Sequence, residues 1–270
     1  MAILASARKN ETVIRLISPA PPDKKVWRSW QTYRSRFVEP KRIVWGVEFY
    51  KQHQNTLQLA HQRFKVPAST IVAIIGVETL YGRNMGNFRI ADALTTLALH
   101  YPETNNQAEA GAIGLPQFMP GIIMRYAIDG DNNGQVDLSN NPTDAILSVA
   151  NFLVKHGWQP DLPVFVPVVL PENPAALVND GLTPKLEWPA LKDMGARFAQ
   201  GASNQKWTSF PLGVIDLVEE AQGTSQYLTA TPHFFALTHY NRSYFYATSV
   251  AGFADAIDIS LRNPKQPAKR

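Results

Sequence analysis

Residues 71–86 read IVAIIGVETLYGRNMG, and the rest of the chain is organised around this segment. Pro67 stands just before it, as proline does at the first position of a helix. The apolar residues between positions 71 and 77 cover most of a helix circumference, which predicts a helix buried in a core. A single carboxylate, Glu78, stands almost at the end of this apolar run.

Two interpretations of Glu78 follow from this pattern. Apolar surroundings raise the pKa of a carboxyl group, which would make Glu78 a proton donor near neutral pH. A capping or salt-bridged glutamate where a helix reaches solvent is the more common case, and periodicity alone favours it.

Four long strings resemble, in order and in wording, the membrane-bound lytic murein transglycosylase B family. They are GVETLYGRNMG (76–86), RIADALTTLALHYP (89–102), AGAIGLPQFMP (110–120) and DAILSVANFLVKHGW (144–158). The resemblance extends from about Trp30 to Trp158 and resumes near Tyr240. It implies a mainly α (α+β) fold, with a lysozyme-like helical core, an N-terminal helical segment and a small inserted β-rich subdomain. It also makes Glu78 the only catalytic acid/base.

The same resemblance implies a set of residues that bind substrate. They are Tyr81, Gln117, Met119, Tyr240, Asn241 and Tyr246. Gln117 can donate and accept hydrogen bonds, which suits N-acetyl and hydroxyl groups. Its alternative role is to cap the helix after Pro120, and for Met119 core packing is an equal alternative.

A candidate cation site lies at residues 129–140, which read DGDNNGQVDLSN. Oxygen ligands fall at the spacing of an EF-hand loop, and Gly134 stands where such a loop turns sharply. The candidate ligands are Asp129, Asp131, Asn133, Gln135 and Asp137, with Asp144 implied by the resemblance as the closing ligand. Asn140 replaces the usual glutamate. We expect structural Ca²⁺ ahead of Na⁺ or Mg²⁺, and no cofactor for chemistry; a metal-free turn is the alternative.

Composition sets broad limits. The 270 residues are 45% hydrophobic and 18% charged, as in a globular protein, and cysteine is absent. No apolar run of about 18 residues predicts a membrane span. The net charge of +4 suits an anionic polymer such as murein, and no basic run interleaved with aromatics suggests nucleic acid. The first ten residues do not resemble a signal peptide, so we expect any targeting segment to be absent from this chain.

We expect four segments. Residues 1–45 form an N-terminal helical segment, 46–159 the catalytic core, 160–231 a small mixed or β subdomain with proline-broken strands, and 232–262 the end of the core. Residues 40–64 predict one helix and 91–100 another. The aromatic residues of 27–37 fall on one helix face, and we interpret them as packing rather than as a sugar platform.

The chain departs from the family at residues 103–110, which are either a natural short version or a missing loop. The expected reaction cleaves the bond between N-acetylmuramic acid and N-acetylglucosamine and closes a 1,6-anhydro ring. The alternatives are a lysozyme-type hydrolase and a non-catalytic murein-binding protein. We expect a monomer in the periplasm, with outer-membrane association a further option and other cell-wall enzymes as candidate partners.

Overall fold

The computed structural model describes residue 9 and residues 27–86, 111–201 and 206–263, and all statements below concern these residues. The helices are α3 (Trp30–Ser35), α4 (Pro40–Gln52), α5 (Gln54–Phe64), α6 (Ala68–Thr79), α8 (Pro120–Tyr126), α9 (Pro142–Lys155), α10 (Trp188–Asp193), α11 (Pro232–Thr238) and α12 (Tyr244–Arg262). The strands are β1 (Phe165–Val166), β2 (Val168–Val169), β3 (Arg197–Phe198), β4 (Gly213–Glu219) and β5 (Thr224–Ala230). Short 3₁₀ helices lie at Pro174–Leu177, Lys206–Ser209 and Glu220–Gln222.

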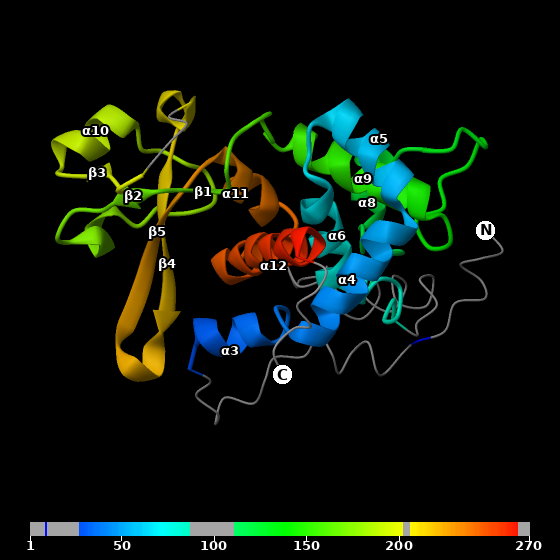
Figure 1. Ribbon diagram of the computed structural model, residues 1–270, viewed down its shortest axis with the longest axis horizontal. Coiled ribbons are helices and arrows are strands. Elements are labelled where there is room, and N and C mark those ends of the chain that lie inside the picture. The colour runs from blue at the N-terminus through cyan, green and yellow to red at the C-terminus, as the bar shows by residue number, and fades with distance from the viewer. Residues whose placement is uncertain (1–8, 10–26, 87–110, 202–205, 264–270) are drawn as a thin grey trace.

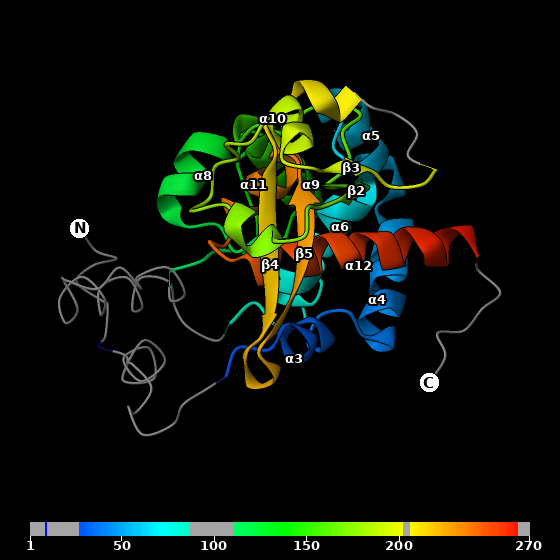
Figure 2. The ribbon, with the colours of Figure 1, turned by 90° about the vertical axis from the view of Figure 1, so that its left-hand side faces the viewer.

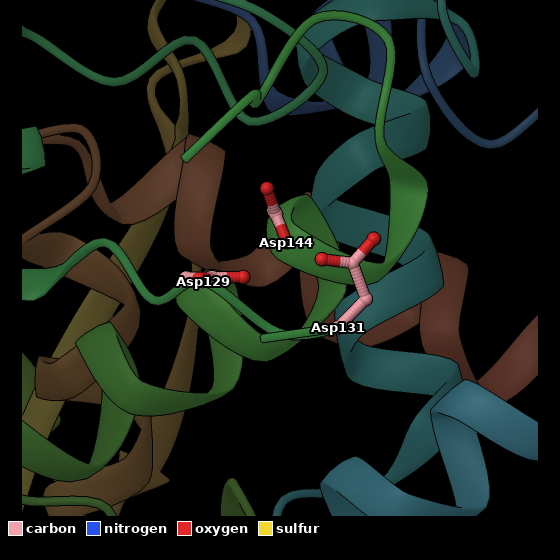
Figure 3. A group of neighbouring side chains, drawn as sticks. All are labelled: Asp129, Asp131 and Asp144. Atoms are coloured by element: carbon pink, nitrogen blue, oxygen red, sulfur yellow. The ribbon is translucent and has the colours of Figure 1, made fainter. Parts of the chain in front are cut away.

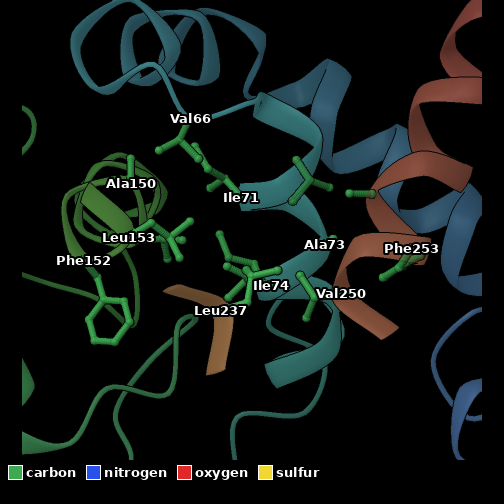
Figure 4. Packing of buried hydrophobic residues seen from close by; sticks show 14 of the residues in the cluster. Val66, Ile71, Ala73, Ile74, Ala150, Phe152, Leu153, Leu237, Val250 and Phe253 are labelled. Atoms are coloured by element: carbon green, nitrogen blue, oxygen red, sulfur yellow. The ribbon is translucent and has the colours of Figure 1, made fainter. Parts of the chain in front are cut away.

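Helix α6 forms the centre of the molecule. Every residue from Ser69 to Gly76 is buried, and α4, α5, α9 and α12 all pack against this helix. Figure 4 shows Ile71 and Ile74 of α6 with α9 on one side and α12 on the other. A fully buried isoleucine contributes about 1.5–3 kcal/mol to folding, so this helix is held by tertiary packing. The prediction of a helix buried all round is confirmed.

The helix that follows the acidic loop is specified by its ends. Asn141 caps α9 by accepting hydrogen bonds from the backbone N–H groups of Thr143 and Asp144, and Pro142 occupies the first turn. After the cap at His156 the chain turns at Gly157, whose φ is +95°. The buried face of α9 packs on α5, α6 and α11.

A smaller β-rich unit lies beside the helices (Figure 1). Its main sheet has the antiparallel order β1-β5-β4, with Gly213 opposite Ala230 in the long hairpin, and β2 pairs with β3. Trp188 and Trp207 are buried in a separate core of this unit, called the β subdomain below. Its strands confirm the expectation of a small inserted β-rich part, and with the helical core they confirm the predicted fold class.

Helix α3 joins the β subdomain to the helical core. It contacts both β4 and α12, and Figure 2 shows it beside the turn of the β4–β5 hairpin. Trp30 is buried, and its ring centroid lies 5.6 Å from that of Phe245, while Tyr33 lies 5.5 Å from the same ring. The packing interpretation of this aromatic stripe is therefore confirmed for Trp30 and Tyr33, whereas Trp27 is 50% exposed.

One helix prediction is wrong in detail. Residues 40–64 form two helices rather than one, because His53 has φ −114° and ψ 24° and interrupts the helical hydrogen bonding. The predicted helix at residues 91–100 and the divergent segment 103–110 lie outside the described residues. None of the described helices combines the length and hydrophobicity that a bilayer span requires.

Candidate active site

Glu78 lies in the last turn of α6, and the end of that helix is firmly attached to its surroundings. The buried Thr79 hydroxyl lies 3.0 Å from the carbonyl oxygen of Leu115 and accepts a hydrogen bond from the N–H of Gly82. Leu80 then takes a left-handed conformation, with φ +51°, and ends the helix. These contacts fix the direction in which the Glu78 side chain leaves the core.

The environment of Glu78 favours its protonated form. Burial raises the pKa of this carboxyl from 4.5 to about 7, while a hydrogen bond from Tyr246 opposes part of that rise. The Tyr246 hydroxyl donates to Oε1 at 2.5 Å. The C-terminal end of a helix carries partial negative charge, which also disfavours a carboxylate there. Near neutral pH, Glu78 can therefore both give and take a proton.

Three tyrosines surround this carboxyl group. Burial, and then the charge of Glu78, raise the pKa of Tyr33, Tyr240 and Tyr246. The rings of Tyr240 and Tyr246 are nearly parallel, with centroids 6.5 Å apart. The Tyr240 hydroxyl is buried and has no hydrogen-bond partner among the described residues, so a polar group of a bound ligand could use it.

Glu78 opens into a cleft of about 310 Å³. The cleft is lined by Glu78, Ala112, Gln117, Phe118, Met119, Ile122, Phe152, Tyr240 and Asn241. Among these described lining residues Glu78 is the only carboxylate. The lining residues are therefore mainly apolar and aromatic, with side-chain amides at two points, which is the composition expected of a small-molecule binding site.

A tight turn places Gln117 in this wall. Backbone hydrogen bonds join Ile113 and Phe118 in both directions, at 2.9 and 3.1 Å, and between them Gln117 has φ +50°. The buried Phe118 ring anchors the turn, while one amide N–H of Gln117 donates to the carbonyl oxygen of Gly114. The half-buried Met119 is the N-cap residue of α8 and also lines the cleft.

The structure brings five of the six expected substrate residues close to Glu78. Gln117, Met119, Tyr240 and Asn241 line the cleft, and Tyr246 lies behind it on Glu78. Ala112, Ile122, Phe152 and Tyr33 were not among the expected site residues. Ile122 could have been found by its spacing, because it follows Met119 by three residues at the start of a helix.

The structure places Tyr81 away from the residues that line the cleft, and its role in substrate binding stays a prediction. Its side chain is 9% exposed and packs between α4, α6 and α12, and its ring centroid lies 5.2 Å from that of Phe49. Its hydroxyl lies over Gly76, where there is no room for a Cβ atom. Tyr81 has φ +60°, so the chain reverses directly after Leu80 and directs this ring into the core.

The acidic loop brings three carboxylates together (Figure 3). Oxygen atoms of Asp129, Asp131 and Asp144 lie within 4.8 Å of one another. Asp144 is fully buried on α9, and its two oxygens accept hydrogen bonds from the N–H groups of Gly130 and Asp137, both at 2.8 Å. Three adjacent carboxylates are costly without a cation, and hard oxygen ligands fit Ca²⁺.

Two other expected ligands, Asp137 and Asn133, accept hydrogen bonds from backbone N–H groups of the loop. Asp137 accepts hydrogen bonds from the N–H groups of Asn140 and, with a smaller effect, Ser139, which stabilise the exit from the loop and lower the pKa of Asp137. The side-chain oxygen of Asn133 accepts from the N–H of Gln135. The cluster of carboxylates therefore includes Asp129, Asp131 and Asp144 but not Asp137.

Comparison with known proteins places these features in a family. The profile described as "Transglycosylase SLT domain" matches residues 1–109 and 102–255. The chain is 32% identical to the membrane-bound lytic murein transglycosylase B of Escherichia coli (strain K12) over 289 aligned residues, which cover 96% of this chain and 77% of that protein.

Solved structures agree in fold. The soluble lytic transglycosylase SltB1 of Pseudomonas aeruginosa matches with a TM-score of 0.82 and 31% identity, over 97% of this chain and 93% of that one. The Escherichia coli lytic transglycosylase Slt35, solved in complex with calcium, matches with a TM-score of 0.78 and 30% identity, over 96% of this chain and 86% of that one. The resemblance noted in the sequence is therefore confirmed, and the chain belongs to the transglycosylase SLT family of lytic transglycosylases that act on peptidoglycan.

Proposed function

We propose that Glu78 is the single acid and base of a lytic transglycosylase reaction on murein. Protonated Glu78 donates its proton to the oxygen that links N-acetylmuramic acid to N-acetylglucosamine, and that bond breaks. The N-acetyl group of the substrate stabilises the positive charge at the anomeric carbon. Ionised Glu78 then takes the proton of the C6 hydroxyl as its oxygen bonds to C1, which closes the 1,6-anhydro ring. No water is consumed, and Glu78 ends the reaction protonated, as it began.

The observation that supports this proposal is the pairing of Glu78 with Tyr246 beside a cleft in which Glu78 is the one carboxylate among the described lining residues. A group that serves first as acid and then as base works best with a pKa near the working pH, and the pKa of Glu78 is about 7. Ordinary glycosidases place a second carboxylate across the scissile bond. Among the described residues that line this cleft, none supplies it, so the anhydro product is favoured over hydrolysis.

The test is mass spectrometry of the fragments that the protein releases from purified sacculi. We expect muramic ends that are lighter by one water than hydrolysis products and that resist borohydride reduction. Reducible muramic ends would identify a hydrolase instead. Binding without any release, equal in wild type and Glu78→Gln, would identify a murein-binding protein.

We propose further that Asp129, Asp131 and Asp144 hold a structural Ca²⁺. The convergence of three carboxylates supports this, because a divalent cation would neutralise most of their charge. The relative Slt35, solved in complex with calcium, supports the same choice of ion. The ion would hold residues 129–141 against α9 and supply no chemistry.

We also propose that the protein works in the periplasm, where murein lies, with outer-membrane association an option. The Escherichia coli relative is a membrane-bound enzyme that acts on murein, which supports this location. The proposed substrates are the glycan strands of peptidoglycan. A monomer is the proposed state.

A further inference from the structure

The N-terminus of α3 is attached to the turn of the β4–β5 hairpin (Figure 2). The N–H of Gln31 donates to Glu219 Oε1 at 2.7 Å, and the N–H of Arg28 donates to Glu220 Oε2 at 2.8 Å. The Arg28 guanidinium also pairs with Glu220, whose own N–H donates to the Arg28 carbonyl oxygen at 2.9 Å. Ser29 and Glu219 form an antiparallel β-bridge. Backbone and side-chain contacts thus join two segments that lie far apart in the sequence.

The short helix α3 depends on contacts from outside itself. The first N–H groups of a helix have no partner within it. The Ser29 hydroxyl accepts a hydrogen bond from the N–H of Thr32, whereas the acceptor for the N–H of Gln31 is Glu219 of the β subdomain. Helices shorter than about 12 residues are marginal on their own, and α3 has six residues. We therefore expect the hairpin to determine how firmly α3 is held.

One turn along α3, Tyr33 reaches the neighbourhood of Glu78. Its ring packs against Phe245 of α12, with centroids 5.5 Å apart, and its pKa is raised by burial and then by the charge of Glu78. Two other tyrosines have a pKa raised by the same carboxyl group, and one arginine acts on Tyr33; these residues are Tyr240, Tyr246 and Arg36. Of the elements around Glu78, α3 is thus the one whose attachment depends on the β subdomain.

We propose that Glu219 is a positioning residue for the reaction, because through α3 it holds Tyr33 beside Glu78 and keeps water away from that carboxyl group. The inference rests on the proposed function of Glu78 as acid and base. Burial is the main cause of the raised pKa of Glu78, so a carboxyl group that gains water should have a lower pKa. More of the protein would then be ionised near neutral pH and unable to donate the first proton. The β subdomain would thereby affect proton transfer, although Glu219 does not line the cleft.

The test is an NMR titration of the Glu78 carboxyl carbon, assigned with Glu78→Gln. We expect Glu219→Ala to lower the pKa of Glu78 by about half a pH unit to one unit, a fraction of the rise that burial causes. Glu219→Gln removes the same charge but keeps an oxygen acceptor for the N–H of Gln31, so it should stay near wild type. Glu187→Ala removes an exposed carboxylate of the β subdomain that forms no capping hydrogen bond, and it should leave the pKa unchanged.

Tyr33→Ala tests whether Glu219 acts through Tyr33. This variant should lower the pKa of Glu78 by itself, and adding Glu219→Ala should cause no further fall, because residues that act through one another are not additive. On murein strands, the alkaline limb of kcat/KM against pH should move to lower pH in Glu219→Ala by the same amount as the NMR titration. Glu220→Ala, which removes the acceptor for the N–H of Arg28, is an independent variant and should shift the pKa of Glu78 in the same direction.

Three results would overturn the inference. They are an unchanged pKa of Glu78 in both Glu219→Ala and Glu220→Ala, an equal fall in Glu219→Gln and Glu219→Ala, and additive falls when Glu219→Ala is combined with Tyr33→Ala. The titration needs no substrate, so it separates this inference from the proposed function. Wild type that cleaves no murein would overturn the proposed function, and with it a role of Glu219 in the reaction, whatever the titration shows.

Discussion

Replacing Glu78 with glutamine should stabilise the fold at alkaline pH even as it abolishes murein cleavage. The pKa of Glu78 is about 7 in the folded protein against an ordinary value of 4.5. An interval of about 2.5 pH units, at 1.36 kcal/mol per unit, corresponds to about 3.4 kcal/mol. Because the side chain borders an open cleft, where charge is screened more than in a closed core, we expect about 2–3 kcal/mol. Glutamine keeps the shape and still accepts the hydrogen bond from Tyr246.

The sign of the pH dependence follows from linkage. With its folded pKa raised, Glu78 contributes stability that is fully present below pH 4.5 and is lost as the pH rises through about 7. The difference between Glu78→Gln and wild type should therefore be small at pH 4.5 and reach its plateau above pH 7. Urea unfolding at about pH 4.5, 6 and 8 measures this difference in the free energy of unfolding. At pH 8 the thermal midpoint of Glu78→Gln should lie about 5 °C above that of wild type.

Glu48→Gln, at an exposed position on α4, corrects for the change of net charge. A stability difference between Glu78→Gln and wild type that is equal at pH 4.5 and pH 8 would refute the reasoning, because the carboxyl group would then not be desolvated by folding.

Three other predictions concern the site and its supports. Tyr246→Phe removes a hydrogen bond that favours ionised Glu78, so the alkaline limb of kcat/KM against pH should move up by about one unit; an unchanged or lower limb would contradict this. Saturating Ca²⁺ should raise the thermal midpoint, with about 2.7 kcal/mol expected at a hundredfold excess over Kd, and Asp129→Ala should remove the increase; equal melting curves with Ca²⁺ and with chelator would argue against a site. Tyr81→Phe deletes a buried hydroxyl that has no partner among the described residues, so urea unfolding should show a gain of about 1 kcal/mol with murein cleavage retained; loss of cleavage would return Tyr81 to the substrate site.

Local patterns made the central helix and the acidic loop predictable. The run before Glu78 is apolar on every face, so burial follows from composition without knowledge of neighbours. The alternating oxygen side chains around Asp129 and Asp131 likewise lie in one short segment. The location of Asp144 beside them came from the family resemblance, because it reaches the loop only through the packing of α9.

Nonlocal packing explains what could not be predicted. Tyr81 stands three residues after Glu78, yet two left-handed residues reverse the chain and turn its ring into the core. Tyr33 lies near Glu78 because its ring packs against Phe245 on α12. This contact joins segments that are more than 200 residues apart in the sequence. None of these follows from spacing along the chain.

The burial of α6 from Ser69 to Gly76 has a consequence for how this enzyme can adapt. Amide hydrogens in the middle of such a helix exchange with solvent only when the whole core opens, and the end of the helix that carries Glu78 is attached to Leu115 through the Thr79 hydroxyl. Gln117 and the exposed Asn241, which also line the cleft, lie instead on short segments between helices. Evolution or engineering can therefore alter those segments to accept other glycan or peptide variants while the proton-transfer geometry stays constant.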